Sequence, residues 1–226
     1  MTHLKGPDTR EAARQINLYL PKGNTTPIIS LQNGVSNCTV ISDELHTDNV
    51  VAAVVYVAVE KINDFTLKHH GRGELKIGYP SGGSSSDFTQ YERTLEEICE
   101  IFASAGVPCE AVPDIRREMF MKFLVNCTFN AISAIGNVEY GSLYIVPEIR
   151  SLIYGVTNEV LSIAEAEGVL ISIEEALAAN EAIFTSMKTQ KSSTAQDLSR
   201  GRKTEIDLLN GYVVECGKKH NIAVRI

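Results

Sequence analysis

Several kinds of functional site are missing from this 226-residue sequence. Its five cysteines are scattered without any C-x-x-C pair, which removes the common zinc motif and is typical of reduced cytoplasmic thiols. The net charge is −7 and no basic stripe offsets it, so nucleic acid is excluded as a partner. The Gly- and Ser-rich stretch Ser81–Ser86 lacks the lysine of a phosphate-binding loop and is interpreted as a connector. We find neither an apolar run of membrane-span length nor a signal-peptide core, and we expect a cytoplasmic protein.

The hydrophobic pattern changes at Pro113. The composition, 44% hydrophobic and 22% charged, is that of an ordinary globular protein. Before Pro113 a helix opens at Thr9, two more are predicted at 37–45 and 88–105, and β-branched or alternating runs predict strands at 27–32, 50–60, 66–71, 74–78 and 107–112. The remaining pattern is helical, at 115–135, 147–167, 173–187 and 204–220. We therefore predict an α/β domain at 1–113 and an all-α domain at 114–226.

A polar stripe interrupts the apolar segment that begins the second domain. Lys122, Asn126 and Asn130 are four residues apart, so on a helix they share one face. The residues between them are mostly large and apolar, and an ammonium in such surroundings must find partners or shift its pKa. A lysine flanked by two carboxamides suits a small oxyacid ligand. A buried lysine with purely structural hydrogen bonds is the alternative, and this stretch alone leaves both open.

A second group of polar residues lies near the predicted last helix. Thr204 and Glu205 stand where that helix is expected to begin, before an apolar face. One interpretation makes Thr204 the N-cap and places Glu205 where the helix dipole favours negative charge. The other makes Glu205 the counter-ion that Lys122 needs.

The chain resembles the ketopantoate reductase family in several separated motifs that occur in the family's order. The matching segments are Lys5 with Asp8-Thr9, Gln32-Asn33-Gly34, Gly71-Arg72-Gly73, Lys122-x3-Asn126-x3-Asn130, Ser192-Ser193-x2-Gln196-Asp197 and Arg202-x-Thr204-Glu205-Ile206-Asp207-x2-Asn210-Gly211. Together they cover most of the chain, which makes the resemblance far more specific than any one motif.

The resemblance implies a fold, a reaction and a set of contacts. The implied fold is a partial Rossmann-like NADP-binding domain followed by an all-α domain of the 6-phosphogluconate-dehydrogenase-like type. The implied reaction is the NADPH-dependent reduction of 2-dehydropantoate to (R)-pantoate, in pantothenate and coenzyme A synthesis. By matched position, Lys122 and Glu205 are catalytic, with Lys122 as the proton donor. The implied substrate contacts are Lys122, Asn126, Asn130, Ser193 and Asn33, and the implied NADP(H) contacts are Lys5, Asn33 and Glu205.

The sequence also departs from the family pattern. No G-x-G-x-x-G occurs before Lys5, where the family's phosphate-binding turn is expected, and the family's final helix is not reached. Gln190 and Tyr140 stand where the family often has asparagines. Three interpretations remain: a truncated ketopantoate reductase, a reductase of another 2-oxoacid, or a non-catalytic remnant that serves as a dimerisation or interaction module. In each case we expect exposed strand edges to cause aggregation or to be covered by a partner, such as a second copy in a homodimer.

Overall fold

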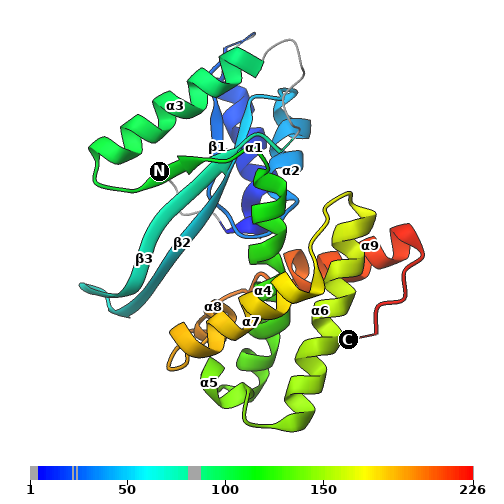
Figure 1. The fold of residues 1–226 in the computed structure, drawn as a ribbon. Coiled ribbons are helices and arrows are strands. Elements are labelled where there is room, and N and C mark those ends of the chain that lie inside the picture. Colours follow the sequence, from blue (N-terminus) through cyan, green and yellow to red (C-terminus); the bar gives the residue numbers. More distant parts are fainter. Residues whose placement is uncertain (1–4, 22, 24, 81–87, 226) are drawn as a thin grey trace. The chain divides into compact units, whose positions relative to one another are not determined.

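The computed structural model describes residues 5–21, 23, 25–80 and 88–225, which excludes the predicted connector Ser81–Ser86. The chain divides into two compact units, Met1–Met119 and Phe120–Ile226. Figure 1 shows both units and labels most of their helices and strands. The division lies within one continuous helix, α4 (Ile115–Gly136), a few residues after the change of pattern at Pro113. An α/β unit is thus followed by a helical unit, as the sequence predicts.

The first unit is built around a four-stranded sheet with the order β1-β2-β3-β4. The β1–β2 and β3–β4 pairs are parallel, whereas β2 and β3 form an antiparallel hairpin. The strands are β1 (Ile28–Ser30), β2 (Val50–Asn63), β3 (Thr66–Gly78) and β4 (Cys109–Ala111). The helices are η1 (Gly6–Asp8), α1 (Thr9–Tyr19), α2 (Asn37–Leu45) and α3 (Phe88–Ser104).

The first residues of strand β2, Val50–Val54, are buried on both faces of the sheet. Its even positions, such as Val50 and Val54, pack with Ala13 of α1 and Ile41 of α2. Its odd positions, such as Val51, pack on the other face with residues of α3. Since successive side chains of a strand point to opposite faces, this apolar run forms the middle layer of an α/β/α arrangement.

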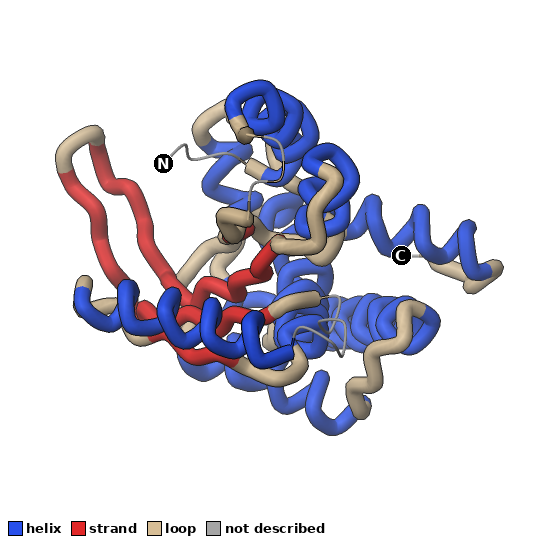
Figure 2. The backbone as a smooth tube through the Cα atoms, turned by 90° about the horizontal axis from the view of Figure 1, so that it is seen from above, coloured by secondary structure: helices blue, strands red, loops and turns tan. Residues whose placement is uncertain are grey.

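The sequence analysis was wrong to divide the second half of the hairpin into two strands. Thr66–Gly78 is a single strand, whose register with β2 shifts on both sides of the Val57–Arg72 pair without ending the ladder. Gly71 and Arg72 have positive φ values of 115° and 59°, which is the conformation of a bulge. Figure 2 shows the resulting long hairpin, at whose tip Phe65 is 99% exposed.

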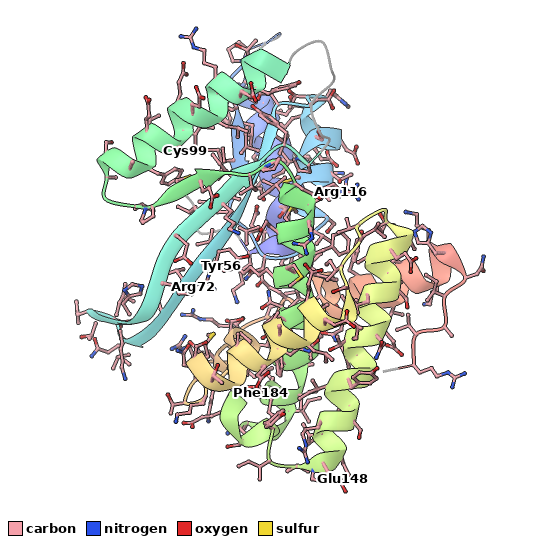
Figure 3. All side chains as sticks on the ribbon, in the orientation of Figure 1. Tyr56, Arg72, Cys99, Arg116, Glu148 and Phe184 are labelled. Carbon is pink, nitrogen blue, oxygen red and sulfur yellow. The ribbon has the colours of Figure 1, made fainter. Side chains whose placement is uncertain are left out.

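The base of this hairpin carries a polar network. The Tyr56 hydroxyl donates to Glu118 Oε2 at 3.1 Å, and Lys76 Nζ lies 2.8 Å from Glu118 Oε1. The Arg72 guanidinium lies 4.0 Å from the centre of the Tyr56 ring; Figure 3 labels both residues. Burial, and then the Glu118 carboxylate, raise the pKa of Tyr56, which therefore remains a donor at neutral pH. The network attaches the first turn of α4 to the sheet.

The second unit is helical from end to end. Its elements are the remainder of α4, α5 (Tyr140–Leu143), α6 (Pro147–Ala166), α7 (Ile173–Ser186), α8 (Ser193–Ser199), η2 (Ile206–Leu208) and α9 (Asn210–His220). The predicted single helix 204–220 is wrong, because Leu209, at φ −103° and ψ −101°, separates η2 from α9. The short α5 and α8 were not predicted, since neither is long enough to show a helical period.

Helix α4 forms the core of the second unit. Phe123, Leu124 and Phe129 are fully buried, and the Phe129 ring packs edge-on against Phe184 and Tyr140. By length and composition α4 could cross a membrane, which the sequence analysis overlooked. However, 56% of its most apolar window is buried within the fold, as in the core helix of a globular protein.

Candidate functional site

The predicted polar stripe lies on α4. Lys122, Asn126 and Asn130 all belong to this helix, so their spacing of four residues places them on one face. Lys122 and Asn126 are half-buried, whereas Asn130 is only 2% exposed. Because the adjacent Phe123 and Phe129 are fully buried, the stripe puts polar groups at the edge of an apolar core.

Two residues from other segments hold Asn130. The Tyr140 hydroxyl donates to Asn130 Oδ1 at 3.2 Å, and the Ser192 hydroxyl donates to the Asn130 carbonyl at 3.1 Å. Tyr140 is 7% exposed, and burial raises its pKa, so its hydroxyl remains protonated at neutral pH. The Tyr140 backbone N–H also donates to the carbonyl of Gln190 at 2.9 Å. The two positions that depart from the family pattern therefore contact each other through their backbones, and the Tyr140 side chain reaches Asn130, which no sequence signal revealed.

Ser193 is the first residue of α8 and is exposed. The preceding Ser192 caps this helix by accepting the Ala195 N–H at 3.0 Å. The Ser192 backbone N–H donates to Ser133 Oγ of α4 at 3.2 Å. Together with its bond to the Asn130 carbonyl, these contacts hold the start of α8 against α4. Ser192 is thus the structural residue of the pair, whereas Ser193 is exposed, and its place beside Asn130 stays a prediction.

The segment that follows Glu205 also packs against α4. Asn210 Nδ2 donates to the Cys127 carbonyl at 3.0 Å, and the Tyr212 and Phe123 rings meet edge-on at 5.7 Å. These contacts bring the start of α9 to the part of α4 that carries Lys122 and Asn126. Within the described residues, Asn210 Oδ1 is buried without a hydrogen-bond partner.

The capping interpretation is wrong for Thr204, which is not an N-cap. Thr204 precedes no helix directly, and Glu205, which precedes η2, makes no side-chain capping hydrogen bond. Glu205 is half-buried, and its carbonyl accepts the N–H groups of Leu208 and Leu209. That its carboxylate meets Lys122 stays a prediction.

In the first unit, Asn33 lies in the turn that connects β1 to α2. The Asn33 carbonyl accepts from Asn37 Nδ2 at 2.7 Å, and Gly34 follows with a φ of 95°. The Thr9 hydroxyl donates to Asn37 Oδ1 at 2.8 Å and accepts from Gln32 Nε2 at 2.9 Å. This chain of buried polar groups fixes the strand–turn–helix connection at Asn33.

Lys5 is half-buried and precedes η1, where its carbonyl accepts the Asp8 N–H at 3.0 Å. Among the described residues, no group of three or more His, Cys, Asp or Glu side chains could hold a metal ion.

Two family models match the chain. Residues 114–226 match the model described as "Ketopantoate reductase PanE/ApbA C terminal", and residues 2–82 match "Ketopantoate reductase PanE/ApbA". A 2-dehydropantoate 2-reductase of Halobacterium salinarum is 27% identical over 223 residues, which is 99% of this chain and 70% of that protein.

Solved structures agree with these matches. The PanE/ApbA family ketopantoate reductase of Ralstonia eutropha JMP134 is 39% identical with a TM-score of 0.82, over 98% of this chain and 69% of that one. A ternary structure of D-mandelate dehydrogenase with NADH and anilino(oxo)acetate has a TM-score of 0.84 over 97% of this chain and 70% of that one. At 21% identity, the second likeness shows the fold alone. The chain spans about 70% of the length of these relatives.

Proposed function

The chain belongs to the ketopantoate reductase family, and we propose that it provides the substrate-binding and proton-donating part of an NADPH-dependent reduction of 2-dehydropantoate to (R)-pantoate. The observation that carries the proposal is the polar stripe Lys122–Asn126–Asn130 on α4, with Asn130 held by Tyr140 and Ser192. With all five cysteines free, we propose the cytoplasm as the place of this reaction.

Lys122 is the proposed proton donor. Reduction of a ketone builds negative charge on its oxygen, which an ammonium already in position stabilises before it gives up a proton. The buried aromatic residues beside Lys122 lower the local dielectric, so this interaction is stronger than in water. We assign Glu205 the role of counter-ion and hydrogen-bond acceptor for the same reaction.

Asn126, Asn130 and Ser193 are the proposed contacts for the carboxylate and hydroxyl oxygens of the substrate. Tyr140 already occupies Asn130 Oδ1, which leaves the two N–H donors of Asn130 Nδ2 for a ligand oxygen. A site with an ammonium, amide N–H groups and a hydroxyl is rich in donors, and a 2-oxoacid consists largely of acceptors.

NADP(H) is the proposed cofactor, and when bound it supplies the hydride. The ordered turn at Asn33, between a strand and a helix, fits the nicotinamide end of a dinucleotide, with Lys5 and Glu205 as further contacts. The sequence contains no G-x-G-x-x-G, and we assign no residue to the cofactor's phosphates.

Titration calorimetry and an NADPH-oxidation assay on the purified chain test the proposal. We expect pantoate to bind, N130A to weaken that binding about tenfold or more, and 2-dehydropantoate to be reduced faster than pyruvate or benzoylformate. K122A should lower turnover by roughly 10²–10⁴-fold while NADPH affinity changes little.

Each contrary result has a separate meaning. Equal turnover in K122A and the parent would reject Lys122 as the donor. Faster reduction of another 2-oxoacid would reject 2-dehydropantoate as the substrate. Failure to bind either pantoate or NADPH would identify the chain as the non-catalytic remnant.

A further inference from the structure

Two cysteine thiols of the first unit are in contact. Cys99 Sγ of α3 lies 3.6 Å from Cys109 Sγ of β4, and Figure 3 labels Cys99. Both residues are half-buried, so small molecules in solution can reach them, whereas the three other cysteines, Cys38, Cys127 and Cys216, are buried. A pair of neighbouring, accessible thiols is a reactive group that the proposed reaction does not use.

The connection between α3 and β4 holds the two thiols together. The Val107 N–H donates to the Phe102 carbonyl at 2.9 Å, and Gly106 has a φ of 75°, which ends α3 with a left-handed residue. Cys109 itself is paired with Leu75 of β3 in the parallel ladder. Because both the helix end and the strand are fixed by backbone hydrogen bonds, the approach of the thiols is part of the fold.

We propose that Cys99 and Cys109 form a redox modification site, which a low-molecular-weight disulfide converts into an intramolecular disulfide between α3 and β4. The Cys99 thiolate attacks one sulfur of the small disulfide, whose S–S bond breaks and releases a thiolate. Cys109 then attacks Cys99 in this mixed disulfide and expels the second thiolate. The protein dithiol loses two electrons, the small disulfide becomes two thiols, and the two cysteine protons pass to them.

The short distance between the two sulfur atoms favours the disulfide, and burial disfavours the thiolate of Cys109. To form the bond, the sulfur atoms must approach from 3.6 Å to about 2.05 Å. Burial first, and then the neighbouring Cys99 thiol, raise the pKa of Cys109 to about 12, so Cys109 remains protonated at neutral pH. We assign the first attack to Cys99, and the single variants C99S and C109S test this order. Once Cys99 is in the mixed disulfide, it no longer raises the pKa of Cys109.

The test treats the purified, reduced chain with 2-hydroxyethyl disulfide, a neutral probe. We choose it because the exposed carboxylates Glu96, Glu100 and Glu110 flank the pair and would repel an anionic disulfide. Proteolysis after glutamate separates Ile98–Glu100 from Ile101–Glu110, so an intramolecular disulfide keeps these two peptides joined until a reductant is added. We expect this linked pair in most of the protein, with no stable adduct on any cysteine.

Two variants separate the roles of the cysteines. C109S should stop at a mixed disulfide on Cys99, and C99S should leave Cys109 unmodified under the same treatment. Circular dichroism establishes that each variant is folded before treatment. Two unlinked peptides with free thiols, or a stable adduct on Cys99 of the parent, would overturn the proposal. Reaction of Cys109 in C99S at the parent's rate would overturn the assigned order of attack.

Discussion

Replacing Tyr140 with phenylalanine removes one hydroxyl from the candidate site and little else. The ring stays in place against Phe129, with centroids 5.9 Å apart, so the substitution opens no large cavity. The substitution removes the 3.2 Å hydrogen bond to Asn130 Oδ1, and Asn130 is only 2% exposed. A hydrogen bond contributes about 0.5–1.5 kcal/mol, and a buried acceptor left unpaired costs about 1–3 kcal/mol. We expect Y140F to lower the free energy of unfolding by roughly 1–2 kcal/mol.

Urea unfolding followed by far-ultraviolet circular dichroism measures this loss, and hydrogen exchange of the α4 amides localises it. Y144F is the matched control, because Tyr144 is 49% exposed and stacks on Phe184 through its ring. Its change should stay within about 0.5 kcal/mol. Because the freed Asn130 carboxamide can rotate, Y140F should also weaken pantoate binding by a few-fold. Equal stabilities of Y140F and Y144F would refute the importance of the Tyr140–Asn130 bond.

Three further results are expected. His220, and next Lys219, lower the pKa of Glu167 below 4.5, so the Glu167 carboxylate stabilises the fold at neutral pH. This contribution is lost as the pH falls through the lowered pKa, so the unfolding curves of E167Q should approach those of the parent in acid. The control variant E165Q should match the parent at every pH. G78A should lower the midpoint of thermal unfolding, because its Cβ would lie 2.8 Å from Ile115 Cβ, whereas G73A should not, since its nearest contact is at 3.9 Å. A disulfide between Cys99 and Cys109, which are ten residues apart, should stabilise the first unit by roughly 2–3 kcal/mol. The midpoint of thermal unfolding should therefore rise on oxidation and fall again when a reductant is added.

Most of the fold could be predicted from local pattern. The helix 37–45 was predicted with the bounds that α2 has, because its apolar period and the preceding Asn33-Gly34 turn agree. The division of β3 failed, since Gly71 and Gly73 are typical of a turn, and only the pairing with β2 turns the same residues into a bulge. The helix predicted from Thr204 failed in a similar way, because the backbone of Leu209 breaks a pattern that is apolar on both sides.

The candidate site was less predictable than the fold. Spacing alone put Lys122, Asn126 and Asn130 on one helix face, because that depends only on the helical period. The residues that hold this face come from elsewhere in the sequence: Tyr140 and Ser192 at Asn130, and Asn210 at Cys127. Such contacts depend on how α5, α8 and α9 pack around α4, and two of these three helices are too short to show a period.

The Tyr140–Asn130 bond also bears on which ligand the stripe can bind. An unrestrained asparagine offers a carbonyl acceptor and an amide donor, and it can exchange them by turning over. The bond from the buried Tyr140 hydroxyl, whose raised pKa keeps it a donor, favours one orientation of the Asn130 carboxamide and leaves both N–H donors of Nδ2 for a ligand. Lys122 likewise has donors only, and Ser193 can donate. Such a face favours a ligand that accepts hydrogen bonds along its length over one that carries its own N–H groups. This is the physical reason to place a 2-oxoacid, rather than an amine or an amide, against this face of α4.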